Sequence, residues 1–352
     1  MTSTRPSGGP IFADGAIDQQ FAIRGYVVHP FLDAAEVRAM EHVHAEIFPE
    51  LLSDFSATTL DDSTERRWRV FEKIRAIVDA PLRRIVPHHK MALATFVTKR
   101  PRTTQGRVPL HQDWWIADNR VHRALHFWCP LVDVGPESGC LKIVPGVHRL
   151  LNDPYPIHPK FRTAYHPRLS VLDGEFALRV PMPAGAALLY DQRMLHGSDE
   201  NRSDRMRVAF NCIMIPEDLT PLLYQWTPDI PDRLQVLEVD ERYLCEFRFG
   251  VPLAPPYPQG VRLVDTIPVA TSPLSDGDFS VLRDMQRMFA DEDRKTRACA
   301  DLLIGPRCHP NRDAPPSMTA QQWRQSVPTG RRAEPLLLGR TGVYSTYHVE
   351  TV

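Results

Sequence analysis

The chain has 352 residues, of which 43% are hydrophobic and 24% charged, and its formal net charge is −1. This is the composition of an ordinary globular protein, long enough for one large domain with extensions or for two domains. It has no basic excess of the kind that binds nucleic acid or membrane surfaces, and no apolar run approaches the roughly 18 residues of a membrane span.

The six cysteines lie far apart in the sequence and form no CxxC pair. In a chain of this size such spacing favours reduced thiols over a disulfide framework. The first ten residues, MTSTRPSGGP, contain no apolar signal core. We therefore expect a cytoplasmic protein that binds a small molecule and has no nucleic-acid or membrane partner; the oligomeric state is left open, with a homodimer as one option.

The N-terminal part predicts a flexible tail, a strand and two helices. Residues 1–19 read as the tail, and residues 21–30, FAIRGYVVHP, as a strand ended by proline. Asp33 and Glu36 have the spacing of a capping box, which predicts a helix beginning there. A second helix is expected over 64–79, with its apolar residues at helical spacing: Trp68, Phe71, Ile74, Ile77 and Val78.

From about residue 90 to 217 the sequence predicts strands separated by Gly/Pro turns. The expected strands are 91–99, 123–134, 139–146, 175–182, 185–191 and 205–216, and the second and third of these are expected to pair across the turn GPES. In 205–216 the alternation places Arg207, Ala209 and Asn211 on one face. Many short strands with helices preceding them indicate a double-sheet jelly roll.

Two further segments complete the expected domain organisation. Residues 150–172 lack periodicity, and a loop of this length is usually functional, so we interpret it as a lid inserted into a domain spanning 20–250. Residues 251–352 are expected to form a Pro-rich C-terminal extension that packs on the core, with one helix near 278–291.

The stretch PLHQDWW (109–115) raises the possibility of a metal site. At a strand end, His111 and Asp113 point to the same side, and His196 at the end of another strand is a candidate third ligand. Two histidines and one carboxylate form the facial triad of non-haem Fe(II) oxygenases. Each residue alone has an ordinary alternative, since Asp113 could cap a turn and His196 could be a turn residue before glycine.

Arg207 follows His196 by eleven residues and lies on the face of its strand expected to point inward. A buried arginine is expensive unless it is paired, and no local acidic residue is placed to pair with it, so a carboxylate ligand would satisfy it. Ser198 could donate a hydroxyl hydrogen bond to the same carboxylate. The alternative is that Arg207 is a surface residue like its neighbours Arg202 and Arg205.

The segments PLHQDWW, GCLKIVPGVHR (139–149) and LHGSDENRSDRMRVAF (195–210) resemble the phytanoyl-CoA dioxygenase family of Fe(II)/2-oxoglutarate-dependent oxygenases. GYVVHPFLDAAEV (25–37) also resembles that family's opening strand and helix, so the resemblance covers roughly residues 20–217. It implies a fold that is mainly β with flanking helices, around a double-stranded β-helix (jelly roll, cupin-like) core.

The resemblance also implies roles for particular residues. His111, Asp113 and His196 would be the catalytic metal ligands, and Arg207 with Ser198 would bind the C5 carboxylate of 2-oxoglutarate. Thr95, Trp128 and Gln112 would complete the co-substrate pocket. The implied cofactors are Fe(II), 2-oxoglutarate and O₂, with ascorbate in vitro. The presence of Asp113, rather than Gly or Ala, resembles hydroxylating members and not halogenases.

The substrate is less defined by the sequence. Trp114 and Trp115 follow the metal motif directly, and at least one is expected to border the substrate, the alternative being that either is core. No long basic cluster is present to hold a CoA phosphate tail, which favours a free small molecule such as a natural-product intermediate of secondary metabolism or an amino-acid-like compound. Two other functions stay open: a non-oxidative jelly-roll isomerase or hydrolase, and a catalytically silent small-molecule-binding protein.

Overall fold

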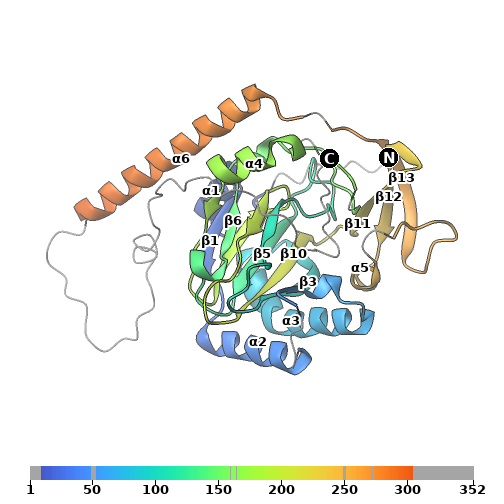
Figure 1. Ribbon diagram of the computed structural model, residues 1–352, viewed down its shortest axis with the longest axis horizontal. Helices are drawn as coiled ribbons and strands as arrows, with labels where there is room; N and C mark the ends of the chain where they lie inside the picture. The colour runs from blue at the N-terminus through green and yellow to red at the C-terminus, as the bar shows by residue number, and fades with distance from the viewer. Residues whose placement is uncertain are drawn as a thin grey trace. The chain divides into compact units, whose positions relative to one another are not determined.

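The fold is described by a computed structural model, which covers residues 9–48, 53–158, 160–163, 165–248, 251–271 and 273–303. Two antiparallel sheets form its core (Figure 1). The larger has the order β1 (Tyr26–Pro30), β8 (Ala186–Asp191), β5 (Leu125–Pro130), β10 (Arg207–Pro216), β3 (His89–Lys99) and β2 (Phe55–Ala57). The smaller has the order β4 (Val108–His111), β9 (His196–Ser198), β6 (Leu141–Ile143) and β7 (Leu178–Arg179). The predicted double-stranded β-helix is confirmed.

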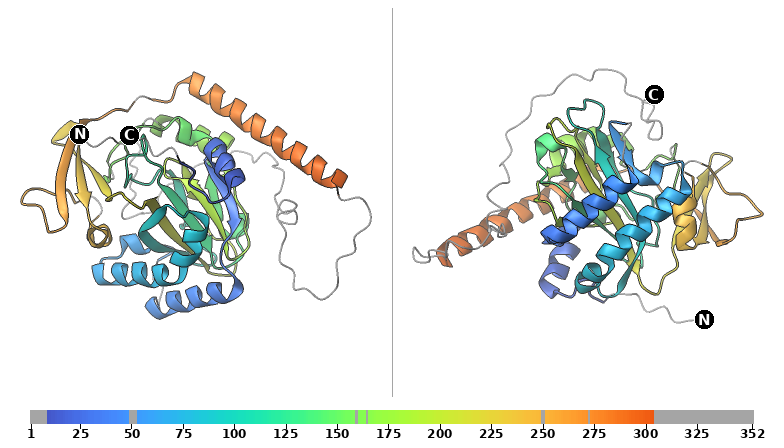
Figure 2. Two further views of the ribbon diagram at one scale, coloured as in Figure 1. Left: turned by 180° about the vertical axis from the view of Figure 1, so that it is seen from behind. Right: turned by 90° about the horizontal axis from the view of Figure 1, so that it is seen from below.

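Helices α2 (Ala34–Ile47) and α3 (Thr64–Ile85) lie side by side against one face of the larger sheet (Figures 1 and 2). The capping box that begins α2 is present, with Asp33 accepting from the Glu36 amide and Glu36 accepting from the Asp33 amide. The helix α3 begins at Thr64 as predicted but continues through Pro81 to Ile85. The apolar faces of both helices pack with Phe210 and Cys212 of β10, so the opposite face of that strand points between the sheets.

The structure differs from the N-terminal prediction between residues 9 and 25, whereas the expected strand ended by proline is present in its second half. Helix α1 (Gly15–Arg24) occupies part of the expected tail and the first half of the expected strand, which is reduced to β1. Asp14 accepts from the amides of Ala16 and Ile17, and Gly25 ends the helix with a φ of 79°. Ile11 and Phe12 are buried, and Phe12 packs on Phe21 of the helix with 5.0 Å between ring centroids. Residues 1–8 lie outside the described part of the chain.

The expected hairpin between 123–134 and 139–146 was also wrong. Strand β5 pairs with β8 and β10 in the larger sheet, whereas β6 pairs with β7 and β9 in the smaller one. The short 3₁₀ helix η2 (Pro136–Ser138) and Gly139 make the turn between them. Gly139 has a φ of 68°, and a Cβ there would lie 2.6 Å from the Asp199 carbonyl oxygen of the smaller sheet. The chain therefore crosses to the other sheet at this glycine instead of folding back.

Between β6 and β7 the chain forms the 3₁₀ helix η3 (Val147–Arg149), then an irregular stretch, and then three short helical turns. These are η4 (His166–Arg168), α4 (Leu169–Val171) and the π-helical η5 (Leu172–Phe176), so the expected strand 175–182 keeps only the two residues of β7. Phe161 and Tyr165 in this segment are buried. The segment is therefore anchored to the core by its own aromatic side chains.

A third sheet follows the jelly roll, with the order β11 (Leu222–Thr227), β12 (Ile230–Val239) and β13 (Val261–Pro268). The short helix α5 (Glu241–Glu246) lies between β12 and β13 in the chain. Strand β13 falls within the region expected to be irregular; it forms because the prolines there precede it or stand at its last position. This sheet extends regular structure beyond the residue, 250, at which the domain was expected to end.

The expected helix near 278–291 is α6 (Asp276–Leu303), which belongs to a second compact unit beginning at Leu274. The predicted packing of the C-terminal extension on the core stays a prediction, and the residues from 304 onward lie outside the described ranges. Among the described helices, none combines the length and the apolar character needed to cross a membrane.

Candidate metal centre

The structure brings His111, Asp113 and His196 together in the smaller sheet. His111 ends β4 and is paired directly with His196, the first residue of β9. One donor atom from each of the three side chains lies within 4.8 Å of the others. The Asp113 carboxylate oxygens are 3.5 Å from His111 Nε2 and 3.6 Å from His196 Nε2. This is a set of two nitrogens and one oxygen converging on one point, which suits a divalent transition metal.

Backbone carbonyls orient both histidines. His111 Nδ1 lies 2.9 Å from the Pro109 carbonyl oxygen, and His196 Nδ1 lies 3.2 Å from that of Met194. A proton on each Nδ1 would be donated to these carbonyls, which leaves the Nε2 lone pairs directed at Asp113 and available to a metal. The tautomers of the two histidines and the spacing of the three donor atoms therefore both fit a bound metal ion.

The protonation states of His196 and Asp113 suit metal binding. Burial, followed by the charge of His111, lowers the pKa of His196 to about 3, so this imidazole is neutral near pH 7. Burial alone would raise the pKa of Asp113, but the neighbouring histidines, His196 first, hold it well below its usual range. A neutral imidazole and an ionised carboxylate are the forms in which these side chains act as ligands. Burial alone would lower the pKa of His111, but the hydrogen bond and charge of Asp113 outweigh it and raise that pKa, so a metal would displace a proton from this imidazole.

A cavity of about 780 Å³, part of it open to solvent, adjoins the three residues and lies between the two sheets. Leu93, Thr95 and Val97 of β3 line one wall, beside Trp128 of β5 and Arg207 of β10. The face of β10 that lines the cavity carries Arg207, Asn211 and Ile213, in agreement with the alternation expected from the sequence. Apolar side chains supply most of the rest of the lining.

Arg207 is the buried cation of this cavity. Arg207 is 1% exposed, and one guanidinium nitrogen donates to the Val97 carbonyl oxygen at 3.1 Å, whereas its Nε has no partner among the described residues. The guanidinium carbon lies 5.6 Å from the centre of the Trp128 ring. Burial lowers the pKa of Arg207 to about 10, which leaves it charged near pH 7. Within the described part of the chain no carboxylate forms an ion pair with it.

The other sequence-predicted residues divide into two groups. Ser198, Thr95, Trp128 and Trp114 line the cavity, whereas Gln112 and Trp115 do not. The side chain of Gln112 is buried on the opposite side of the extended chain from its neighbours His111 and Asp113, as strand alternation requires. Trp115 is fully buried and packs edge-on against Tyr224 of β11, with 6.3 Å between ring centroids.

Two residues of the site were missed by sequence reasoning. His126 of β5 is fully buried, and its Nδ1 lies 3.6 Å from the Asp113 carboxylate. Its ring stacks on that of Tyr190 of β8, with centroids 4.8 Å apart and an interplanar angle of 10°, and Tyr190 lines the cavity. The available signal was strand alternation, since His126 lies two residues before Trp128 and therefore on the same face.

The loop that carries Asp113 is held by the segment expected to be a lid. The Gln112 amide donates to the Tyr165 hydroxyl at 3.2 Å, and the Trp115 amide donates to the Tyr155 carbonyl oxygen at 3.0 Å. These two bonds fix the backbone on both sides of Asp113. The 150–172 segment therefore supports the loop that carries Asp113 directly.

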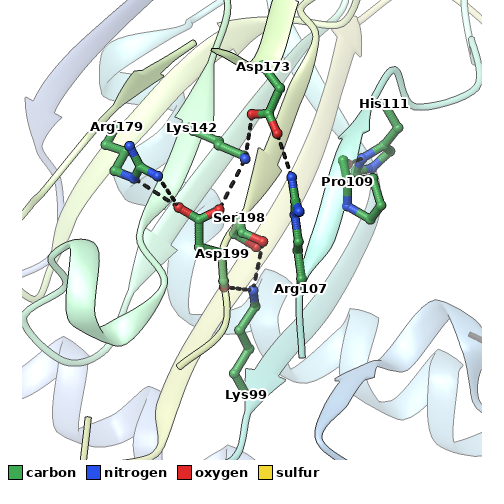
Figure 3. A network of polar contacts seen from close by, with 9 residues as sticks. All are labelled: Lys99, Arg107, Pro109, His111, Lys142, Asp173, Arg179, Ser198 and Asp199. Carbon is green, nitrogen blue, oxygen red and sulfur yellow. Dashed lines mark hydrogen bonds and ion pairs between the residues drawn. The ribbon is translucent and has the colours of Figure 1, made fainter. Parts of the chain in front are cut away.

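A chain of ion pairs connects the same segment to the smaller sheet (Figure 3). Lys142 of β6, nearly buried, lies 2.5 Å from Asp173 of η5 and 3.1 Å from Asp199, which follows β9. Arg107, just before β4, pairs with Asp173 at 2.6 Å, and Arg179 pairs with Asp199 at 2.6 Å. Figure 3 shows the Lys142 amino group between the two carboxylates. The network ties η5 to the strands on either side of the metal ligands.

Comparisons with known proteins agree with this geometry. The sequence profile of the phytanoyl-CoA dioxygenase (PhyH) family matches residues 21–209. Phytanoyl-CoA dioxygenase domain-containing protein 1 of Bos taurus is 29% identical over 131 residues, which are 35% of this chain and 43% of that protein. The chain spans less than half the length of the curated relatives it matches.

Two solved structures are also similar to this chain. The non-haem α-ketoglutarate-dependent carbocyclase SnoK from nogalamycin biosynthesis is 20% identical, with a TM-score of 0.46, 73% of this chain covered and 100% of that chain. HygX from Streptomyces hygroscopicus, crystallised with nickel and 2-oxoglutarate, is 17% identical, with a TM-score of 0.43 and coverages of 58% and 88%.

Proposed function

Because the chain belongs to the phytanoyl-CoA dioxygenase family, whose profile matches more than half of its residues, we propose that it is an Fe(II)- and 2-oxoglutarate-dependent dioxygenase. In this proposal it oxidises an unactivated C–H bond of a small molecule by hydroxylation. The co-products are succinate and CO₂.

One observation carries the proposal. Arg207, buried and without a carboxylate partner among the described residues, lines the same cavity as the His111–Asp113–His196 set. A buried guanidinium without a counter-charge is strongly destabilising, so the site needs an anion to complete it. A dicarboxylate that reaches from the guanidinium to the metal would satisfy both ends of the cavity, and 2-oxoglutarate is such a molecule.

Each residue of the site has a role in this proposal. His111, Asp113 and His196 hold Fe(II), and Pro109 and Met194 fix the two imidazoles through their carbonyls. Arg207 and Ser198 hold the C5 carboxylate of 2-oxoglutarate, beside Thr95 and Trp128 in the cavity wall. When bound, Fe(II) with 2-oxoglutarate and O₂ supplies the oxidant that removes a substrate hydrogen. The protein contributes orientation and a largely apolar surrounding that excludes water.

The lining also bears on the substrate. Apart from the two histidines, the charged or ionisable side chains that line the cavity are Asp113, Arg207 and the buried phenol of Tyr190. Arg207 and Asp113 are used by the co-substrate and the metal, so the described lining offers no further cation for a substrate phosphate or carboxylate. We propose a free, uncharged small molecule such as a natural-product intermediate as the substrate, with Trp114 bordering it.

Succinate formation tests the function. The purified protein is incubated with 2-oxoglutarate, ascorbate and a metabolite library, in parallel with Fe(II), Zn(II) or Mn(II). The proposal expects succinate to form with Fe(II) but not with Zn(II) or Mn(II). The amount of succinate should rise when the library contains a productive metabolite. Substrate conversion with Zn(II) and without 2-oxoglutarate would instead identify a non-oxidative metalloenzyme. Ligand binding without any turnover would identify a binding protein.

A further inference from the structure

The carboxylate of Asp113 has a polar neighbour that does not belong to the metal-ligand set. Its Oδ1 lies 3.5 Å from His111 Nε2, and its Oδ2 lies 3.6 Å from both His196 Nε2 and His126 Nδ1. A carboxylate that gives one oxygen to a metal leaves the other free to be held by a donor in the protein. Among the described residues outside the ligand set, His126 is the one whose side chain lies within 4 Å of this carboxylate as an ion-pair partner.

The surroundings of His126 determine which nitrogen carries its proton. Its ring is fully buried, and its Nε2 has no partner within the described part of the chain. The Nδ1 lies 3.1 and 3.4 Å from the two amide atoms of Asn211, whose orientation sets whether it donates or accepts. A buried N–H without a partner is more costly than a bare ring nitrogen, so the tautomer with the proton on Nδ1 is favoured. That proton faces Asp113 and Asn211.

His126 also has little freedom to turn away from Asp113. Its ring stacks on Tyr190 with 4.8 Å between centroids, and on β5 it stands opposite Tyr190 of β8 and Ile213 of β10. Its position between two strands of the larger sheet thus directs a fixed N–H toward the carboxylate of Asp113, on the loop that follows β4. Asn211, on β10, holds the same nitrogen from the cavity side.

We propose that His126, fixed by Tyr190 and Asn211, is a positioning residue that orients the Asp113 carboxylate for metal binding through its Nδ1–H. The inference rests on the metal-binding part of the proposed function. It assigns His126 no contact with substrate, metal or co-substrate: it acts through Asp113. Outer partners of this kind typically change metal affinity by about 10- to 100-fold when removed.

The affinity of the full-length apo protein for Ni(II), measured by calorimetric titration, tests this proposal. His126→Phe keeps the stacked ring and removes the N–H, and its Ni(II) dissociation constant should rise about 10- to 100-fold. His126→Asn places an amide N–H near the position of Nδ1 and should stay within about threefold of the unsubstituted protein. The thermal midpoint of each apo variant reports whether the fold itself has changed.

A matched control uses another buried histidine. His44 is 7% exposed, pairs with Thr98 Oγ1 at 3.1 Å and packs edge-on against Phe96, away from the metal ligands. His44→Phe should bind Ni(II) as the unsubstituted protein does. If His126→Phe does not fold, His126→Met removes the same N–H with a side chain that adapts to its surroundings, and the same loss of affinity is expected.

The outcomes separate the inference from the proposed function. Unchanged Ni(II) affinity in folded His126→Phe or His126→Met overturns the inference and leaves the proposed function standing. An equal loss in His126→Asn, or in His44→Phe, also overturns it, because the N–H facing Asp113 would then not be the cause. If the unsubstituted protein binds no Ni(II), the metal site of the proposed function fails and the inference fails with it.

Discussion

Arg207 of β10 and Lys99 of β3 stand directly opposite one another, two fully buried basic side chains on adjacent strands. Lys99 Nζ donates to the backbone carbonyls of Ser198 and Asp199, and burial followed by the charge of Arg207 lowers its pKa to about 6. Arg207 keeps its charge and has one carbonyl partner. The hydrogen bonds of Lys99 are thus made within the protein, whereas the charge of Arg207 is available to an anionic ligand. This difference is the electrostatic basis of the proposed co-substrate site.

Replacement of Arg207 should therefore act on the co-substrate and spare the metal. In Arg207→Met, 2-oxoglutarate binding to the Ni(II)-loaded protein should weaken by at least about 100-fold, since a charge-assisted contact is lost in a buried site. Calorimetry measures both affinities. Arg67→Met is the matched control, because Arg67 is also buried and donates to backbone carbonyls, those of Glu246 and Phe247. Equal 2-oxoglutarate affinity in Arg207→Met would make that arginine structural.

Removal of the carboxylate ligand should abolish metal binding. In Asp113→Ala the Ni(II) dissociation constant should rise by at least about 100-fold, in keeping with the share of one ligand in a protein metal site. Asp118→Ala is the control, because the Asp118 carboxylate is near in sequence but pairs with Arg120. An Asp113→Ala protein that binds Ni(II) as tightly as the control would remove Asp113 from the ligand set.

His44 should make the fold sensitive to acid. Burial lowers its pKa from 6.5 to about 4. Between pH 6.5 and pH 4, His44 is therefore protonated in the unfolded chain but neutral in the folded protein. Stability is therefore lost as pH falls from about 6.5 to about 4, by up to about 3 kcal/mol from this group. Urea unfolding at pH 7 and pH 4.5 measures it. His44→Phe should lose less stability over this interval than the unsubstituted protein; an identical loss would show that His44 does not titrate with folding.

Asp173 should hold the 150–172 segment in place. It is the partner of both Arg107 and Lys142, so Asp173→Asn removes two ion pairs, one of them to a nearly buried lysine. Trypsin should then cleave faster at the exposed Arg162 of this segment, because local opening becomes easier. Asp79→Asn, which breaks an exposed pair with Arg83, is the control and should be cleaved at the unsubstituted rate. Unchanged cleavage in Asp173→Asn would mean that the buried aromatics alone hold the segment.

Residues whose geometry follows from strand alternation were predictable from the sequence. His111, His196 and Arg207 are strand-end or inward-facing residues, and the structure places them around one cavity. Gln112 was wrongly grouped with them, although the same alternation turns its side chain to the other side of the chain. The sequence could not decide whether Trp115 borders the substrate or is core. Its burial depends on Tyr224, which is more than 100 residues later in the chain and belongs to a separate sheet.

Long-range contacts explain the remaining differences. The segment 139–146 has the sequence of a hairpin partner for 123–134, and the crossover at Gly139 arises only from the packing of the two sheets. His126 approaches Asp113 across that same packing, so strand alternation could place it on the same face as Trp128 but could not show that it lies beside Asp113. Helix α1 was missed although its signals are local, since the cap residues Asp14 and Gly25 stand at its two ends in the sequence.

The release of labelled CO₂ from 2-oxoglutarate carrying ¹⁴C at C1 tests the central claim most directly. The purified protein is supplied with Fe(II), ascorbate and O₂, with and without the metabolite library, beside Asp113→Ala and Asp118→Ala. The proposed dioxygenase predicts Fe(II)-dependent release that a productive metabolite increases, that Asp118→Ala retains and that Asp113→Ala loses. Release equal to the protein-free background under every condition would contradict it.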